Sequence, residues 1–524
     1  MNSEDTPPLR KLLPVTWLPF FGRFGGLTPI QTKVIPRILA GQNVVIASPT
    51  ASGKTEAVTA PVIELLFSGQ DVQRLSVIYV VPTRALANDT FGRLSDAIKG
   101  TNLVADIKHG DRPNLPSQLP HFLITTPESL DSLICRRSGE FSNLKTLILD
   151  EIHLLDNTYR GDQLRLLIQR LRELSHTNFA THLLSATLKN PAKVALRYVG
   201  NFEIVDGGSQ RAIHYQFKHS HEEILHLAQA NKWRKLLYFC NKRETVEEVA
   251  AQLRPLWNPY PVRVHHGSLD RRIREESEAL MKTARIAVCV STSTLEVGID
   301  VGNIDAVVLC EVPWSISSLQ QRIGRGNRRK DFIEVIGLTQ QKSEAEVLEA
   351  MLQAAIQGEI SETQYEADLS VVIQQVFSYL FQNTRGAETT TIVELTKPLC
   401  DEQKTKTILT HLAQQGFIEY QNLKWFASTE IMNMGEKGKL HSNIPDTYSY
   451  QVVDTNSGKK IGSISGTFDV IFVLARKAWQ VTRIAGNTIY AAQFQGKANS
   501  AMFRRSENHG AFHDLLPPDL KAFD

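Results

Sequence analysis

The sequence predicts an α/β protein with two parallel-sheet domains in tandem, followed by a helical domain that ends in a hairpin and by a small β-rich domain. Three observations predict this fold. Short apolar runs alternate with helical patterns over two long stretches of the chain, which is typical of parallel α/β sheets. Helical patterns and then two short strand-like runs follow from about residue 361. From Tyr448 onward the pattern is strand-like.

Length and composition allow several ordinary domains. The chain has 524 residues, enough for roughly three or four domains of about 100–200 residues each. Hydrophobic residues make up 42% of it, charged residues 22%, and the net charge of +3 permits a nucleic-acid partner without requiring one. Five cysteines without a C-x-x-C pair favour reduced, buried thiols. No apolar run reaches about 18 residues and the N-terminus lacks a signal-peptide core, so we expect a cytoplasmic protein without a membrane partner.

The first predicted sheet lies within residues 21–207. It follows a lead-in of residues 1–20, which we expect to be loose because it is rich in proline and polar residues. A helix is expected over residues 162–174, where leucines recur on one face. The strands are expected at the apolar runs 44–47, 75–81, 122–125, 146–149 and 183–185.

The second predicted sheet lies within residues 208–360, beyond a glycine-containing linker at residues 206–209. It repeats the alternation of apolar runs and helical patterns. Two such sheets in tandem indicate a nucleotide cleft between them. The strands are expected at 236–239, 262–265, 286–290, 306–309 and 333–336.

The remainder of the chain changes in pattern. Residues 361–427 are assigned to a winged helix, because helices followed by a small hairpin are typical of that motif. Residues 428–524 are predicted to form a small β-rich domain with turns at 456–458 and 485–487. In the winged helix we expect helices at 370–381, 392–395 and 402–415, and hairpin strands at 417–420 and 424–426.

Residues 44–55, V-V-I-A-S-P-T-A-S-G-K-T, carry the strongest functional signal. An apolar strand, a loop of small residues and a helical pattern together indicate a P-loop, in which N–H groups surround phosphate oxygens. Lys54 would contact the β/γ-phosphates and the Thr55 hydroxyl would hold Mg²⁺. Ala51 stands where glycine is common, so turnover can be slow even if nucleotide binds. The predicted ATP-binding loop is Ser48, Pro49, Thr50, Ala51, Ser52, Gly53, Lys54 and Thr55.

A carboxylate pair, Asp150-Glu151, follows the apolar run of the fourth predicted strand. Asp150 would hold the metal and Glu151 would orient and deprotonate the attacking water. His153 comes next, and Ser185 and Thr187 end the following strand. Hydroxyl groups there can bond the carboxylates or His153, so we predict that these three residues couple to the nucleotide state. The candidate magnesium residues are Thr55, Asp150 and Glu151.

Residues 320–329 place arginines beside glycines. Arg325 and Arg328 are one helical turn apart, so both can reach one γ-phosphate across a cleft and stabilise its charge. A solvated basic helix start is the alternative. Residues 291–300 follow a predicted strand with several hydroxyl groups that suit phosphates, and Asp300 suits a ribose hydroxyl; a capped helix is the alternative there. The candidate catalytic residues are Lys54, Glu151, Arg325 and Arg328.

These stretches, in this order, resemble the motifs of superfamily 2 helicases. The segment 150–155 with Arg160-Gly161, and the segment 265–269, resemble more closely the DExH-box large helicase-related (Lhr) family. The resemblance implies two RecA-like domains, at 21–207 and 208–360, then a winged helix and a further small domain. The matching segments are 28–31 (Q motif), 48–55 (I), 82–87 (Ia), 126–128 (Ib), 150–153 (II), 185–187 (III), 237–241 (IV), 291–300 (V) and 321–328 (VI).

The resemblance also implies roles and an activity. Gln31 would recognise adenine, and ATP and Mg²⁺ would be the cofactors. The implied activity is ATP-dependent movement, 3′ to 5′, along single-stranded DNA that separates DNA or RNA:DNA duplexes. Trp425 can stack on bases, whereas Trp479 lies in an apolar strand context and is expected in the core. The residues expected to contact the nucleic-acid backbone are Thr83, Arg84, Thr126 and Thr294.

Two other functions stay open at this point. One is an RNA helicase built on the same core. The other is a nucleic-acid-binding scaffold, with protein partners in a repair or defence system, in which the ATPase is weak. Ala51 and Asn327 motivate the scaffold, because both replace motif glycines. Asparagine tolerates a left-handed turn, so the position of Asn327 can still function.

Overall fold

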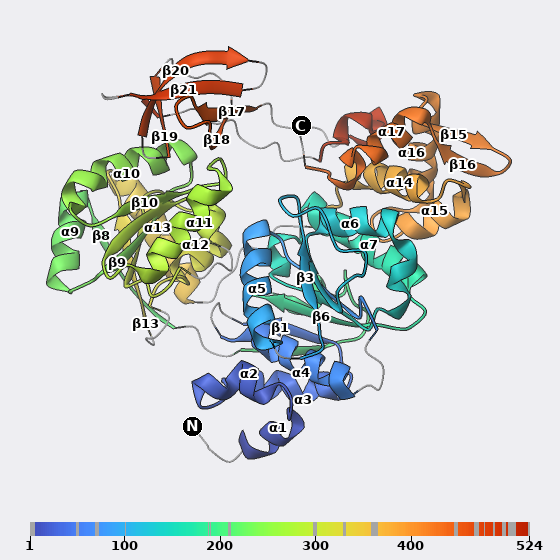
Figure 1. Ribbon diagram of the computed structural model, residues 1–524, viewed down its shortest axis with the longest axis horizontal. Helices are drawn as coiled ribbons and strands as arrows, with labels where there is room; N and C mark the ends of the chain where they lie inside the picture. The colour runs from blue at the N-terminus through green and yellow to red at the C-terminus, as the bar shows by residue number, and fades with distance from the viewer. Residues whose placement is uncertain are drawn as a thin grey trace. The chain divides into compact units, whose positions relative to one another are not determined.

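The computed structural model describes residues 6–48, 52–68, 73–99, 101–186, 188, 190–207, 211–296, 301–327, 332–357, 365–444, 449–465, 471–475, 477–485, 488–494, 499–500 and 510–521. The chain divides into two compact units, which we call the first and the second unit (Figure 1). The first unit comprises residues 1–208, 363–446 and 507–524, and the second comprises residues 209–362 and 447–506. Among the described residues, no helix is long and apolar enough to cross a bilayer.

A parallel sheet of seven strands forms the centre of the first unit, in the order β3-β4-β2-β5-β6-β1-β7. Its inner strands are apolar runs buried on both faces, as expected for a parallel sheet covered by helices. The five predicted strands are confirmed, with small shifts at their ends. The sequence did not predict the edge strands β3 and β7, because polar residues interrupt them. The strands are β1 Val44–Ala47, β2 Val77–Val80, β3 Ala105–Lys108, β4 Phe122–Thr125, β5 Thr146–Leu149, β6 Ala180–Ser185 and β7 Glu203–Asp206.

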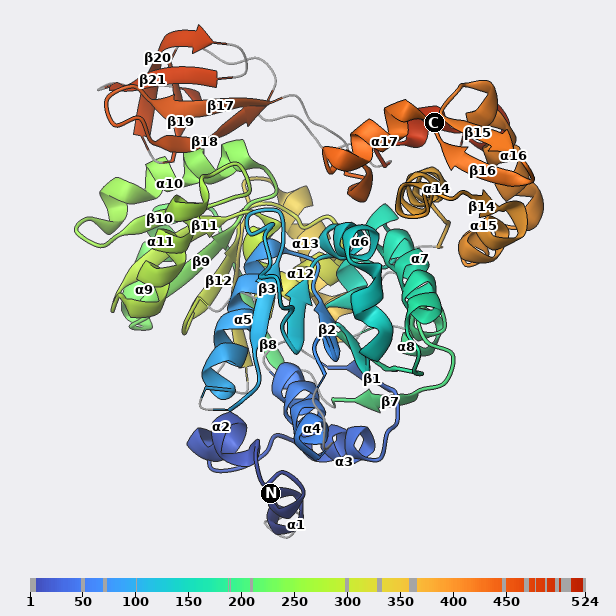
Figure 2. The ribbon, with the colours of Figure 1, turned by 45° about the vertical axis from the view of Figure 1, so that its right-hand side comes forward.

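Helices connect these strands and cover the sheet (Figure 2). The predicted helix at residues 162–174 is confirmed as α7, Tyr159–Leu174, which buries a stripe of leucines. Thr158 begins it by accepting hydrogen bonds from two backbone N–H groups of its first turn. The other helices of this part are α3 Pro29–Leu39, α4 Lys54–Ser68, α5 Arg84–Ala97, α6 Pro127–Arg136 and α8 Pro191–Ala195.

The N-terminal residues are ordered against helices α3, α4 and α5 of the first unit, so the expectation of a loose lead-in is wrong for the residues described there. They form α1 (Thr6–Leu12) and α2 (Trp17–Phe21). Glu64 of α4 accepts hydrogen bonds from the Thr16 backbone N–H, at 2.9 Å, and from the Thr16 hydroxyl, at 2.7 Å. The prediction failed because it weighed the prolines and polar residues above the aromatic residues, of which Phe21 is fully buried.

The helical part of the first unit lies beside α6 and α7 (Figures 1 and 2). Its small antiparallel sheet has the order β14-β16-β15. Phe512 and Leu516 share its core, so part of residues 428–524 packs here and not in the β-rich domain. The winged-helix assignment stays a prediction. The elements are α14 Ser370–Gln382, β14 Ala387–Glu388, α15 Thr389–Thr396, α16 Glu402–Gln414, β15 Ile418–Gln421, β16 Lys424–Ala427 and α17 Thr429–Glu436.

The second unit contains a parallel sheet of six strands in the order β10-β11-β9-β12-β13-β8. The five predicted strands are confirmed, and β8 is an additional edge strand. Its strands are β8 Ala212–Lys218, β9 Lys235–Phe239, β10 Val262–His265, β11 Ala287–Ser291, β12 Ala306–Leu309 and β13 Phe332–Leu338. Its helices are α9 His221–Ala230, α10 Arg243–Trp257, α11 Arg271–Thr283, α12 Ile316–Ile323 and α13 Lys342–Ile356.

A β-rich sheet packs on the second unit beside α10, with the order β18-β17-β21-β20-β19-β22. Glu247 of α10 accepts a hydrogen bond from the Ala475 backbone N–H at 2.8 Å, and the two parts share one apolar core. Trp479 belongs to that core, as expected. Trp425 of the first unit is also buried, with its indole N–H bonded to Thr389, so its prediction as a base-stacking residue is wrong. The strands are β17 Ser449–Asp454, β18 Lys460–Ser465, β19 Ile471–Leu474, β20 Lys477–Ala485, β21 Thr488–Phe494 and β22 Asn499–Ser500.

Candidate functional site

The predicted P-loop lies between β1 and α4, which begins at Lys54. The Lys54 side chain is buried, and its Nζ donates a hydrogen bond to the Ser48 carbonyl at 2.6 Å. Gly53 has φ +87°, a conformation that favours glycine. Thr55 is the second residue of α4. Pro49, Thr50 and Ala51 lie outside the described residues, so the expected effect of Ala51 stays a prediction.

Gln31 lies against this loop, as its predicted role requires. Its Nε2 donates to the Gly53 carbonyl at 3.3 Å, and the Thr28 hydroxyl donates to the Ser52 carbonyl at 2.9 Å. A Cβ atom on Gly53 would lie 2.4 Å from Gln31 Nε2. A larger residue at that position would therefore displace the end of the Gln31 side chain. The contact with adenine stays a prediction.

The carboxylate pair follows β5. In the sheet β5 lies next to β6, and β6 lies next to β1, the strand that precedes the P-loop. Asp150 Oδ1 accepts a hydrogen bond from the Glu151 backbone N–H at 2.8 Å, and Oδ2 accepts one from the Tyr79 hydroxyl at 2.7 Å. Burial, and then the charge of Glu151, raise the pKa of Asp150. Glu151 has φ +45°, a backbone conformation that is uncommon outside glycine and concentrates at functional sites.

His153 and Ser185 are in direct contact, so the structure brings together two of the three predicted coupling residues. The Ser185 hydroxyl lies 3.0 Å from His153 Nδ1, and the Ala186 backbone N–H donates to the same nitrogen at 3.3 Å. Nδ1 is therefore an acceptor and does not carry a proton. Burial lowers the pKa of His153 to about 4, which keeps the ring neutral near pH 7. Thr187 lies outside the described residues.

The predicted backbone-contact residues of the first unit have partners of their own. Thr83 begins α5 and accepts a hydrogen bond from the Leu86 backbone N–H at 3.2 Å. Arg84 is half-exposed and pairs with Asp111 at 2.5 Å. Thr126 is buried, and its carbonyl accepts a hydrogen bond from the Leu130 backbone N–H at 2.9 Å. Contact with nucleic acid stays a prediction for all three residues, and it would require Arg84 to exchange its aspartate partner for a phosphate.

Two residues that sequence reasoning gave no role organise these segments. Arg160 donates to Glu128, at 2.5 Å, and to the Pro82 carbonyl, at 2.6 Å, and so joins the predicted motifs Ia and Ib. The sequence signal for Arg160 was that the dipeptide Arg160-Gly161 resembles part of the Lhr pattern. Tyr79 contacts Asp150, but a tyrosine within an apolar run predicts only a core position.

In the second unit, Arg325 is buried and its guanidinium donates to the Glu296 carbonyl, through Nε at 3.1 Å. Thr294 is 2.8 Å from His265 Nδ1, also within that unit. Asn327 has φ +42°, which confirms the expected left-handed turn. Arg328 and Asp300 lie outside the described residues. The catalytic role of Arg325 and the nucleic-acid contact of Thr294 stay predictions.

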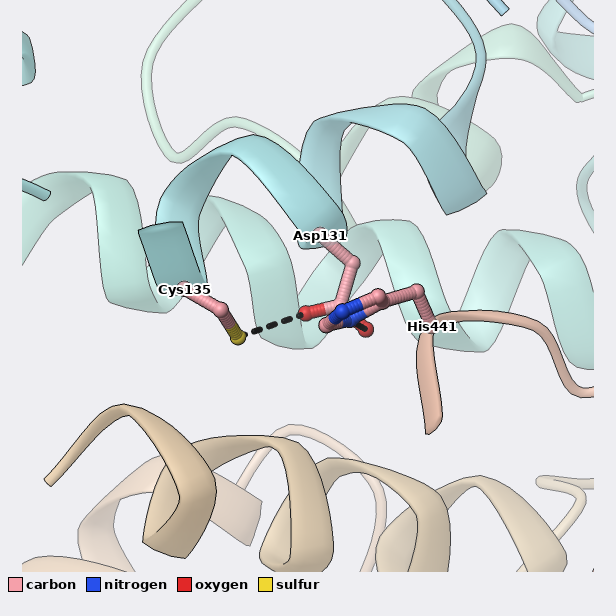
Figure 3. A group of neighbouring side chains, drawn as sticks. All are labelled: Asp131, Cys135 and His441. Carbon is pink, nitrogen blue, oxygen red and sulfur yellow. Dashed lines mark hydrogen bonds and ion pairs between the residues drawn. The ribbon is translucent and has the colours of Figure 1, made fainter. Parts of the chain in front are cut away.

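A separate cluster, also in the first unit, has the residue types of a metal site (Figure 3). Asp131 and Cys135 of α6 and His441 each place one potential ligand atom within 4.8 Å of the others. Asp131 Oδ1 already accepts hydrogen bonds from Arg170 Nη1, at 2.7 Å, and from the Ser378 hydroxyl, at 2.6 Å. Its Oδ2 accepts hydrogen bonds from Gln163, Gln374 and Gln375.

The groups around Asp131 already balance its charge. Burial would lower the pKa of His441, but Asp131 and Cys135 outweigh it and raise the pKa to about 9. His441 and Arg170 are therefore both cationic at neutral pH, and both pair with the Asp131 carboxylate. We interpret the cluster as an ion-pair network that joins α6 and α7 to α14.

The raised pKa of His441 predicts a pH-dependent stability. His441 has a pKa of about 9 in the folded protein, against the usual 6.5. Its protonation therefore contributes fully to the free energy of unfolding below pH 6.5, and this contribution is lost as the pH rises through 9. We expect the melting temperature of the first unit to fall over this window in the wild type and less in His441→Gln. Thermal melting monitored at several pH values measures the difference. Equal slopes in the two proteins would contradict the ion pair with Asp131.

Comparison with known proteins identifies the core. Residues 28–194 match the DEAD/DEAH box helicase family, and residues 217–330 match the helicase conserved C-terminal domain. The chain belongs to superfamily 2 of the helicases. The parallel sheets of its two units are accordingly the two RecA-like domains of this superfamily.

Within the superfamily, the chain is similar to Lhr proteins. It is 32% identical over 368 residues to an ATP-dependent helicase Lhr-Core of Sulfolobus acidocaldarius, covering 62% of this chain and 42% of that protein. It is 36% identical over 352 residues to the Lhr-Core of Methanocaldococcus jannaschii, covering 59% of this chain and 41% of that protein. The chain thus spans less than half the length of these relatives.

A solved structure shares the fold. The Mycobacterium smegmatis helicase Lhr, bound to single-stranded DNA and AMP-PNP, superposes with a TM-score of 0.75 at 24% identity, covering 84% of this chain and 63% of that chain. The likeness extends beyond the residues matched by the two helicase families, and so includes part of the helical or β-rich regions.

Proposed function

We propose that this chain is an ATP-dependent helicase that moves 3′ to 5′ along single-stranded DNA and separates DNA or RNA:DNA duplexes. One observation carries the proposal: the P-loop, the carboxylate pair and the His153–Ser185 contact lie at the carboxyl ends of three adjacent parallel strands, β1, β5 and β6. Ligands bind at that edge in open parallel sheets. The Lhr relatives named as ATP-dependent helicases support the activity.

Each residue at this edge of the sheet can have a separate role in phosphoryl transfer. Lys54 would exchange the Ser48 carbonyl for phosphate oxygens. Glu151 would orient the attacking water and hold its proton. His153 is neutral and bonded to Ser185, and the Glu151 carboxylate lies 3.6 Å from its Nδ1. A change of charge at Glu151 would therefore act on the ring electrostatically and through it on Ser185. Arg325 and Arg328 stay our candidates for stabilising charge on the transferring group.

The donor set suits magnesium. Thr55 is the second residue of α4, directly after the P-loop, and Asp150 directly follows β5. A hydroxyl and a carboxylate are oxygen donors of the kind that Mg²⁺ prefers. We therefore assign Thr55 and Asp150 as magnesium ligands, with Glu151 beside them. When bound, the ion would neutralise charge on the nucleotide phosphates.

The nucleic-acid substrate is DNA in this proposal because the solved relative holds single-stranded DNA. Thr83, Arg84, Thr126 and Thr294 are the proposed backbone contacts. The segment 361–427 is proposed as a winged helix, since the elements of its described residues follow the order helix, strand, helix, helix and hairpin. Phosphate contacts do not read sequence, so any preference for a site must come from these accessory parts or from protein partners.

A strand-displacement assay tests the proposal. Duplexes of DNA, RNA and RNA:DNA, each with either overhang, are incubated with ATP and the full chain. We expect displacement of DNA and hybrid duplexes that carry a 3′ single-stranded tail. Displacement of RNA duplexes alone would favour the RNA helicase. Absence of displacement from every substrate, together with retained binding, would favour the scaffold.

A further inference from the structure

We propose that Tyr79 is a positioning residue that holds Asp150 in the orientation in which it binds magnesium. The inference deepens the proposed function and rests on it. Tyr79 lies in β2, adjacent to β5 in the sheet, and none of its surface is exposed. From there its side chain reaches Asp150 at the end of β5, which is 71 residues further along the chain.

The hydroxyl of Tyr79 makes this contact. It donates a hydrogen bond to Asp150 Oδ2 at 2.7 Å. A phenol has one proton to donate, and here the carboxylate receives it. One buried hydroxyl therefore anchors a proposed metal ligand.

Both oxygens of Asp150 are oriented by this arrangement. Oδ1 accepts the Glu151 backbone N–H at 2.8 Å, while Oδ2 accepts the Tyr79 hydroxyl. A carboxylate held at both ends cannot rotate freely, so its remaining lone pairs point in fixed directions. Loss of the Tyr79 bond would leave Oδ2 without this donor, and Asp150 would be free to turn.

A purely structural role for the hydroxyl is the competing explanation. The ring packs near Phe122, at 6.1 Å between centroids, and phenylalanine would fill the same space. Burying a hydroxyl in this apolar strand costs free energy unless it is hydrogen-bonded. Arg93 is a charged group that also interacts with Asp150. It does not take over the hydrogen bond of Tyr79, because its guanidinium pairs with Glu56 and Asp89, at 3.2 and 3.1 Å.

The first unit contains a matched control. Tyr198 is also buried, and its hydroxyl donates to a carboxylate, Asp156 Oδ1, at 3.0 Å. Tyr198→Phe therefore removes the same group and the same kind of hydrogen bond as Tyr79→Phe. Asp156 pairs with Arg197 and has no proposed part in metal binding. Because the chemical change is the same in both variants, any difference between them comes from where the hydroxyl is removed.

The experiment measures nucleotide binding and not turnover. A fluorescent ATP analogue is titrated into the full chain at increasing Mg²⁺, and separately in EDTA. Removing an outer partner of a metal ligand typically weakens the metal by about 10–100-fold. We expect the half-saturating Mg²⁺ concentration to rise by about 10-fold or more in Tyr79→Phe, with unchanged affinity in EDTA and unchanged Mg²⁺ dependence in Tyr198→Phe.

Two results would overturn the inference. If Tyr79→Phe matches the wild type in its Mg²⁺ dependence, the hydroxyl is only a satisfied core group and the proposed function stands. If the wild type binds the analogue equally with and without Mg²⁺, or not at all, the proposed magnesium site is wrong. The inference about Tyr79 is then wrong as well. Thermal melting of both variants checks that the fold is retained.

Discussion

Lys54→Ala is expected to abolish ATP turnover while strand binding stays largely intact. The Lys54 ammonium lies at the start of α4, buried, beside the loop in which the phosphates are proposed to bind. Without it, the charge of the β/γ-phosphates is not balanced at that point. Turnover is measured as phosphate release with single-stranded DNA present, and strand binding by fluorescence anisotropy.

Lys108→Ala is the matched control for this prediction. Lys108 is a buried lysine of the same unit, and its Nζ also donates to a backbone carbonyl, that of Pro113, at 2.8 Å. It lies on the edge strand β3, away from the P-loop. We expect turnover close to that of the wild type. Undiminished turnover in Lys54→Ala would contradict the proposal that the P-loop binds the phosphates of ATP.

Arg170→Met is expected to destabilise the first unit by about 3–5 kcal/mol, because it removes one of the two cations that balance the buried Asp131 carboxylate and leaves its hydrogen-bond partners unpaired. Asp131 has no exposed surface and Arg170 is 1% exposed. Methionine retains much of the length of the arginine side chain, so the main loss is charge. The free energy of unfolding is measured in denaturant, with hydrogen exchange in α6 and α14 reporting where the structure opens.

A double mutant separates the charge from the packing. Adding Asp131→Asn to Arg170→Met removes the carboxylate that has lost its arginine partner, so we expect the double mutant to regain part of the loss. Arg172→Met serves as the control on the same helix, because Arg172 is exposed and such changes usually cost less than about 0.5 kcal/mol. Strictly additive losses from the two single changes would contradict the ion pair.

The inner strands could be predicted from the sequence because burial on both faces makes them continuous apolar runs. β1 and β5 begin and end where their runs do. Edge strands lack that signal: Val205 is the one residue of β7 that is buried. The N-terminal helices were missed for a related reason, since their stability comes from Glu64 and from aromatic packing that only the folded chain supplies.

The candidate site divides in the same way. Lys54, Asp150, Glu151 and Ser185 could be predicted because each stands at a fixed place in an ordered set of motifs. Tyr79 could not, since its role depends on β2 lying next to β5. The network around Asp131 depends on a contact with Ser378, which is 247 residues further along the chain. Pairings of that range leave no local pattern to recognise.

The rate of ATP hydrolysis, with and without nucleic acid, tests the central claim most directly. The wild-type chain is assayed alone, with single-stranded DNA and with single-stranded RNA of equal length. The account predicts slow hydrolysis by the chain alone and strong stimulation by DNA, abolished in Lys54→Ala. Equal and negligible rates under all three conditions would contradict an ATP-driven motor.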